Sequence, residues 1–367
     1  MTDAVIKFDF QINDTALDDL RFRLGITRFP DHVEDAGWEY GIPVEYLREL
    51  VSYWRHEYDW KAEEARINEL EQFRTIIDRE AIHFVHVRSP NPDAFPLLLM
   101  HGWPGAFTEF LDVIPLLRDT YDLIVPSLPG YGFSNLGWRR GWDVPRIARA
   151  FIALMARLGY SRYGAQGGDW GAQIATRIGA LDPEHCVAIH LNMPIAERPA
   201  EAVELSADDH AGLAALAHFQ REESGYALEQ STKPQTIGVA LHDSPAAMLG
   251  WIVEKFRTWS DCDGHPENAF TRDQMLTIAS IYWFTGTSAS AARLYWEHRN
   301  SKEAQQYVSV PTGVARYPKE VLRFPRPWID RRYNVTHWVD MPRGGHFAAM
   351  EQPALFADDL RNFFLNL

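Results

Sequence analysis

Cysteines and long apolar runs are scarce in this sequence. Its 367 residues include two cysteines, Cys186 and Cys262. Two thiols are too few for a disulfide framework, so we expect ordinary buried or semi-buried thiols in a reducing compartment. No run of 18 apolar residues occurs, which predicts that no helix crosses a membrane. The first 30 residues contain repeated aspartates and no apolar segment typical of a signal peptide, so we expect a soluble, cytoplasmic protein.

Basic residues are also in deficit. Lys and Arg number 36 and Asp and Glu number 50, which gives a formal charge of −14. This balance argues against a nucleic-acid partner, because nucleic acids favour a basic surface. Apolar residues make up 46% of the chain, an ordinary share for a globular protein whose core needs no disulfide or metal. The 13 Trp, 14 Tyr and 20 Phe residues indicate aromatic core packing and hint at an aromatic-lined pocket.

The order of the apolar patterns predicts an α/β fold. Continuous apolar runs at 96–100 and 121–126 are typical of parallel strands that are covered on both faces. An amphipathic helix is expected at 144–158. Strand patterns return at 308–310 and 335–339. Strands that alternate with helices predict a mostly parallel central sheet flanked by helices.

We expect four consecutive segments. Residues 1–75 are helical and charged and would form an N-terminal extension. Residues 76–195 would form the first part of the α/β core. Residues 196–305 lose the strand–helix alternation, so they are predicted to be a helical lid insertion. Residues 306–367 would complete the core and end in an amphipathic helix.

The strongest motif is Gly167–Gly171, with the sequence GGDWG. It follows a predicted strand and precedes a helix, the setting in which Gly-x-Ser-x-Gly forms a nucleophile elbow. Flanking glycines allow a sharp turn that exposes the central side chain, which here is Asp169. The alternative is a glycine-rich turn in which Asp169 only caps the helix.

A second motif, His101–Gly105 (HGWPG), follows the buried strand that ends at Met100. In an α/β-hydrolase fold, the loop at this place supplies one donor of the oxyanion hole, and the residue after the nucleophile supplies the other. The predicted donors are the backbone N–H groups of Trp103 and Trp170. Pro104 cannot contribute, because it has no N–H.

A late histidine completes the order of nucleophile, acid and histidine in this fold. His346 follows two glycines and precedes the last helix, so we predict that it is the base. The acid that orients it should follow the preceding strand, where Glu320 is the preferred candidate. Asp330 is the alternative. Asp340 also competes, but it lies on the strand that leads to His346 and is too close in sequence to reach back to the ring.

These motifs resemble those of the epoxide hydrolases of the α/β-hydrolase superfamily, and most closely those of the microsomal and juvenile-hormone branch. The resemblance covers nearly the whole chain. Asp18–Leu24 and Tyr53–Trp54 look like that branch's N-terminal extension, and Arg343–Ala349 looks like the segment around its histidine.

The resemblance assigns roles to particular side chains. It implies that Asp169 is the nucleophile, His346 the base and Glu320 the acid. Tyr226 and Tyr295, both in the helical insertion, match the family's pair of tyrosines that bind the epoxide oxygen. The membrane-anchoring helix of the microsomal enzymes has no counterpart in this sequence, so a microsomal location is not expected.

These residue types suit the hydrolysis of an epoxide to a vicinal diol. A carboxylate can attack an sp³ carbon and leave an ester, which a water activated by histidine can open. The two tyrosines would donate hydrogen bonds or a proton to the leaving oxygen. No cofactor is implied, and no His-Glu-x-x-His or Cys-x-x-Cys spacing predicts a metal site.

Two other functions stay open at this point. A haloalkane dehalogenase shares the Asp nucleophile, with Trp170 as a halide donor, but it does not use the tyrosine pair. A non-catalytic binding protein could use the same fold. The expected partner is a small-molecule epoxide, without nucleic acid or membrane. The sequence leaves open whether the chain forms a homodimer, and whether it serves detoxification or secondary metabolism.

Overall fold

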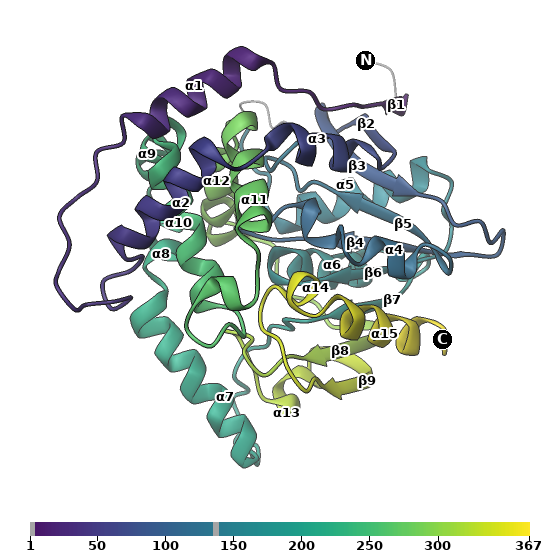
Figure 1. Ribbon diagram of the computed structural model, residues 1–367. Helices are drawn as coiled ribbons and strands as arrows, with labels where there is room; N and C mark the ends of the chain where they lie inside the picture. Colours follow the sequence, from purple (N-terminus) through teal and green to yellow (C-terminus); the bar gives the residue numbers. More distant parts are fainter. Residues whose placement is uncertain (1–3, 135–138) are drawn as a thin grey trace.

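One mixed β-sheet forms the centre of the protein. The computed structural model describes residues 4–134 and 139–367 (Figure 1). Within them, nine strands lie in the order β1-β2-β3-β5-β4-β6-β7-β8-β9. Neighbours from β5 to β9 run parallel, whereas β1, β2, β3 and β5 pair antiparallel. This confirms the mostly parallel sheet expected from the sequence. The strands are Ile6–Lys7 (β1), Gln72–Ile77 (β2), Glu80–Val87 (β3), Phe95–Met100 (β4), Tyr121–Pro126 (β5), Tyr163–Gly167 (β6), Cys186–Leu191 (β7), Val308–Arg316 (β8) and Tyr333–Asp340 (β9).

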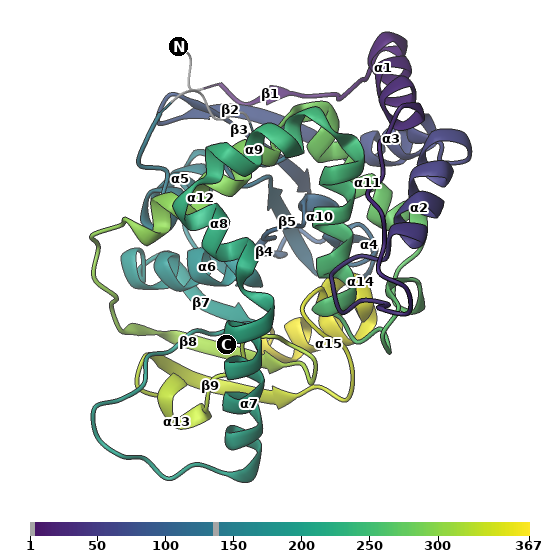
Figure 2. The ribbon, with the colours of Figure 1, turned by 90° about the vertical axis from the view of Figure 1, so that its left-hand side faces the viewer.

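Helices cover both faces of the sheet (Figure 2). Helices α5 and α6 pack together on one face, and α4, α14 and α15 lie on the other. Because both faces are covered, Leu97, Leu98 and Leu99 of β4 are all fully buried. The helices around the sheet are Phe107–Phe110 (η1), Ile114–Leu117 (α4), Val144–Arg157 (α5), Asp169–Leu181 (α6), Arg326–Ile329 (α13), Ala348–Glu351 (α14) and Pro353–Phe364 (α15).

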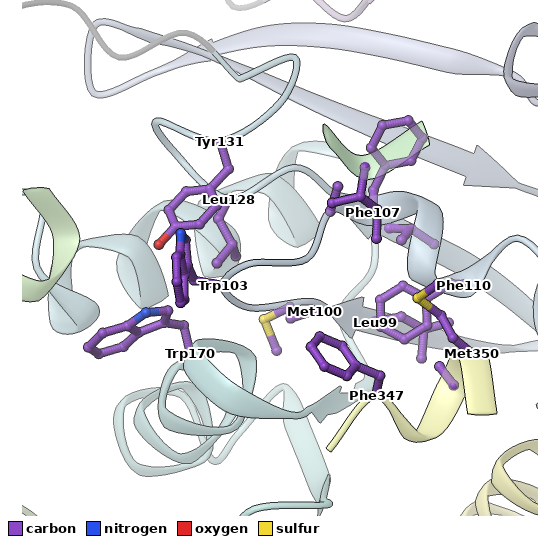
Figure 3. Packing of buried hydrophobic residues seen from close by; sticks show 14 of the residues in the cluster. Leu99, Met100, Trp103, Phe107, Phe110, Leu128, Tyr131, Trp170, Phe347 and Met350 are labelled. Atoms are coloured by element: carbon purple, nitrogen blue, oxygen red, sulfur yellow. The ribbon is translucent and has the colours of Figure 1, made fainter. Parts of the chain in front are cut away.

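The apolar core continues from the sheet towards the predicted nucleophile. Figure 3 shows Trp103 and Trp170 close together near Met100, at the end of β4.

Cys186 and Cys262 are both free and buried, as expected from the sequence. In the described part of the chain, no helix is long and apolar enough to cross a membrane.

A helical insertion lies between β7 and β8, within the range expected for a lid. It places its helices over one end of the sheet (Figure 2). Its elements are Ala207–His218 (α7), the π-helix Phe219–Glu223 (η2), Gly225–Thr232 (α8), Pro234–Asp243 (α9), Pro245–Thr258 (α10), Pro266–Asn268 (η3), Arg272–Thr285 (α11) and Ser288–Arg299 (α12).

The N-terminal extension packs along the outside of this insertion (Figure 1). Its helices are Asp14–Gly25 (α1), Val44–His56 (α2) and Trp60–Asn68 (α3). The Trp54 indole N–H donates to the Ser280 hydroxyl of α11 over 3.0 Å, and both groups are buried. The extension also adds β1 to the sheet edge, and β2 spans the boundary expected between residues 75 and 76.

Candidate active site

The predicted elbow is present at the junction of β6 and α6. Asp169 begins α6 and has a backbone φ of +48°, in the left-handed region that a non-glycine residue rarely adopts. Neighbouring glycines make this turn feasible. A side chain on Gly167 would collide with the backbone of Gly171, and one on Gly171 would collide with the Met100 carbonyl. The tight approach of α6 to β4 and β6 therefore requires glycine at both positions.

The loop after β4 supplies a donor to the Asp169 carboxylate. The Trp103 backbone N–H donates to Asp169 Oδ1 over 2.8 Å. His101 holds this loop in place, because its Nε2 accepts the Leu128 N–H at 3.1 Å and its Nδ1 donates to the Gly102 carbonyl at 2.9 Å. Burial lowers the pKa of His101 to about 4, so the ring is neutral near pH 7.

Trp170 lies beside this donor. Its backbone N–H is in the first turn of α6, where helix N–H groups have no partner within the helix. Its indole N–H is buried without a hydrogen-bond partner among the described residues. The predicted second donor of the oxyanion hole is thus next to Asp169.

His346 lies between the nucleophile and an acid. Its Nδ1 is 2.9 and 3.2 Å from the two Glu320 carboxylate oxygens, and its Nε2 is 3.5 Å from Asp169 Oδ2. The backbone N–H groups of Val321 and Leu322 donate to Glu320 Oε1 and fix the carboxylate. Burial acts to lower the pKa of His346, but the charges of Glu320 and Asp169 outweigh it and raise that pKa well above its ordinary value.

The two competing acids lie elsewhere. Asp330 is largely exposed and sits 3.7 Å from Arg326 on α13. Asp340, at the end of β9, pairs with Arg316 at 2.5 Å and its side chain is 60% exposed. Of the three acids considered from the sequence, Glu320 is the one whose carboxylate contacts His346.

The two predicted tyrosines are brought together above the indoles. Tyr226 on α8 stacks on Trp103, with ring centroids 4.9 Å apart and planes 8° apart. Tyr295 on α12 meets Trp170 edge to face at 4.7 Å, and the two tyrosine rings are 5.9 Å apart. Burial, and secondarily the charge of Asp169, raise the pKa of Tyr226 well above its ordinary value. Burial does the same for Tyr295, so both hydroxyls are protonated donors at neutral pH.

Trp259, which the sequence did not single out, joins these groups. It follows α10 and packs against both Tyr226 and His346, with ring centroids 5.1 and 5.0 Å apart. Its carbonyl accepts the His346 backbone N–H at 2.9 Å. The helical insertion therefore contacts the histidine loop directly.

A small cavity adjoins the nucleophile and the histidine. Besides Asp169 and His346, it is lined by three polar residues that the sequence did not single out, namely Glu109, Gln166 and Asn192. The available signal was Glu109 itself, a glutamate within the apolar run around η1, where a charged side chain is uncommon. Within the described residues, no group of three or more His, Cys, Asp or Glu is placed to hold a metal ion.

Comparisons with known proteins show which families this chain resembles. Residues 5–110 match a family model described as the epoxide hydrolase N terminus, and residues 96–237 match one for the alpha/beta hydrolase fold. The chain is 38% identical to epoxide hydrolase 1 of Sus scrofa, over 98% of this chain and 88% of that protein. It is similar to the structure of juvenile hormone epoxide hydrolase from the silkworm Bombyx mori, with a TM-score of 0.93, 32% identity and coverage of 98% and 94%. It is also similar to that of an Aspergillus niger epoxide hydrolase, with a TM-score of 0.91, 34% identity and coverage of 99% and 96%.

Proposed function

The chain belongs to the epoxide hydrolase family, and we propose that it adds water to a small-molecule epoxide in two steps, through an ester on Asp169. Epoxide hydrolysis follows from the family, which favours it over haloalkane dehalogenation and over a non-catalytic binding role. The observation that supports the two-step route is the placement of His346 Nε2 at 3.5 Å from Asp169 Oδ2, with Glu320 behind the ring. This arrangement provides a carboxylate that can form an ester. It also provides a base, oriented by an acid, that can promote hydrolysis of the ester.

In the first step, a carboxylate oxygen of Asp169 attacks a ring carbon of the epoxide. The carbon–oxygen bond of the ring breaks and its electron pair goes to the ring oxygen. Tyr226 and Tyr295 donate hydrogen bonds to that oxygen, and one of them transfers its proton. Their raised pKa values keep both hydroxyls protonated until the oxygen develops charge.

Ester formation removes the Asp169 charge that helps to raise the pKa of His346, which favours the neutral ring. In the second step, the neutral His346 removes a proton from water, and the water oxygen attacks the Asp169 carbonyl carbon. The Trp103 N–H, which already donates to Asp169 Oδ1, and the Trp170 N–H stabilise the oxyanion. One such donor typically contributes about 2.7–4 kcal/mol to the transition state. As the ester bond breaks, the leaving alkoxide takes the remaining proton of the attacking water, so Asp169 is released as a carboxylate and the diol leaves. The proton held by His346 returns to the tyrosine, so the enzyme is restored.

Trapping the ester tests this route. The His346→Gln variant should still accept the epoxide but should not release it, because the base is missing. With excess styrene oxide, intact-protein mass spectrometry should show an added mass of one substrate molecule. Introducing Asp169→Ala into the same variant should abolish the adduct. Absence of any adduct in the His346→Gln variant would contradict the covalent route.

An isotope experiment gives an independent check. In a single turnover in oxygen-18 water, the label should appear in Asp169 before it appears in the diol, because the attacking oxygen stays on the carboxylate. A labelled diol with an unlabelled Asp169 would show that water attacks the epoxide directly.

A further inference from the structure

The cavity beside Asp169 is separate from the tyrosines. Neither Tyr226 nor Tyr295 is among its lining residues, whereas Asp169 and His346 both are. It offers about 20 Å³ of space to water, which is enough for one water molecule. A water at this place would be next to the ester carbonyl and the base, with the epoxide oxygen at a different site.

The carboxyl group of Glu109 is held in position in this cavity. Glu109 lies on η1, directly after the loop that carries Trp103. A Cβ atom on Gly105 would overlap Glu109 Oε1, so the carboxyl group packs closely against the backbone there. That backbone is itself anchored, because the Tyr282 hydroxyl of α11 donates to the Gly105 carbonyl over 2.9 Å.

Glu109 is electrostatically close to both reacting groups. Burial raises the pKa of Glu109 to about 8, the charge of His346 lowers it, and the charge of Asp169 raises it. The carboxyl group is therefore mainly neutral near pH 7. A neutral carboxyl keeps an acceptor oxygen and adds no second negative charge beside the nucleophile.

Gln166 supplies a second, independent sign that the cavity suits water. Its side-chain N–H donates to Asn192 Oδ1 over 3.2 Å, which leaves Gln166 Oε1 buried without a partner among the described residues. Buried acceptors of this kind are usually satisfied by protein or by ordered water. A cavity with an unpartnered amide oxygen and a carboxyl group provides the polar contacts that a buried water needs.

We propose that Glu109 binds the water molecule that hydrolyses the Asp169 ester. In the resting cavity, one O–H of this water donates to Gln166 Oε1 and the other to a Glu109 carboxyl oxygen. In the reaction, the first O–H turns from Gln166 to His346 Nε2 and gives up its proton, while the second keeps its bond to Glu109. This leaves a lone pair of the water oxygen directed at the ester carbonyl carbon. The inference rests on the proposed ester route, and it assigns Glu109 to the second step alone.

Two variants of Glu109 separate this role from a structural one. Glu109→Leu keeps the volume but removes the acceptor oxygen. Glu109→Gln keeps a carbonyl oxygen in nearly the same place. In a single turnover with styrene oxide, we expect both to form the ester at a rate within about threefold of the parent, because the first step does not use this water.

The rates of ester decay should then differ. We expect decay to slow on the order of a hundredfold in Glu109→Leu and to stay within about tenfold of the parent in Glu109→Gln. In steady state, kcat and KM should fall together for Glu109→Leu, which a general loss of structure would not produce. The exposed loop variant Glu34→Gln should match the parent in both steps.

Three results would overturn the proposal. The first is decay of the ester at the parental rate in Glu109→Leu. The second is an equal slowing of ester decay in Glu109→Leu and Glu109→Gln. The third is an equal slowing of ester formation and ester decay in Glu109→Leu. A failure of the ester route itself would be distinguishable, because the parent and the His346→Gln variant would then give no ester at all.

Discussion

Keeping Glu109 in the protein interior should cost stability in a pH-dependent way. The ordinary pKa of this carboxyl is 4.5, and burial raises it to about 8 in the folded chain. Between these values the unfolded chain has lost its proton while the folded chain retains it. The folded state then binds more protons, so the free energy of unfolding falls as pH rises through this window. Below pH 4.5 the penalty is absent, and above pH 8 it is complete.

The size of the effect follows from the same two pKa values. Each pH unit in the window costs about 1.4 kcal/mol, so at pH 7 the penalty is about 3 kcal/mol. Glu109→Gln removes the titrating group and should remove the pH-dependent penalty with it. With an unfolding entropy of about 2.1 cal/mol/K per residue, 3 kcal/mol corresponds to about 4 °C for a chain of this length.

Thermal unfolding of the parent and of Glu109→Gln at pH 5, 6, 7 and 8 measures this effect. The midpoint of the variant should rise relative to the parent as pH increases. Glu34→Gln, which removes an exposed carboxylate, should show no such trend. A constant difference between the parent and Glu109→Gln from pH 5 to pH 8 would refute the reasoning, because Glu109 would then titrate alike in the folded and unfolded chains.

Three further outcomes follow from the site and its supports. Glu320→Gln should slow ester hydrolysis on the order of a hundredfold, measured by the decay of the adduct, whereas Asp330→Asn should leave it unchanged. Tyr226→Phe and Tyr295→Phe should each slow ester formation about a hundred- to a thousandfold, and the double variant should be nearly inactive; parental activity of the double variant would make the tyrosines packing residues. Trp54→Phe should lower the unfolding free energy by about 1–3 kcal/mol in thermal or denaturant melts, because it leaves a buried hydroxyl without its partner.

Local sequence patterns were sufficient to predict the position of a functional group where that position depends on a single strand or turn. The elbow around Asp169 could be predicted because glycines at fixed offsets follow a strand and precede a helix. The acid was harder to assign, because Glu320 and Asp330 both follow the strand β8. Only their three-dimensional surroundings distinguish a carboxylate bonded to His346 from one on the surface.

Glu109 is marked in the sequence only as a glutamate within an apolar run, and nothing local marks Gln166 or Asn192 as its neighbours. Gln166 is on β6 and Asn192 directly follows β7, and they contact each other because these strands are neighbours in the sheet. Glu109 joins them from a separate loop. The short strand β1 was missed for a related reason: two residues carry no periodicity, and pairing with β2 defines it.

The contact between the N-terminal extension and the helical insertion bears on how ligands reach Asp169. Outward rotation of the insertion as a rigid body would break the hydrogen bonds from Trp54 to Ser280 and from Tyr58 to Thr277, both of them buried. It would also expose the Trp54 ring, which is 3% exposed while the insertion is docked.

Each hydrogen bond contributes about 0.5–1.5 kcal/mol net, and burial of a large side chain contributes about 1.5–3 kcal/mol. Their sum, roughly 2.5–6 kcal/mol, would keep the conformer with the insertion rotated outward at about one molecule in a hundred or fewer, since every 1.4 kcal/mol is a factor of ten. We therefore expect epoxide and diol to exchange through rotamer changes that open a narrow passage, with the insertion remaining docked throughout turnover.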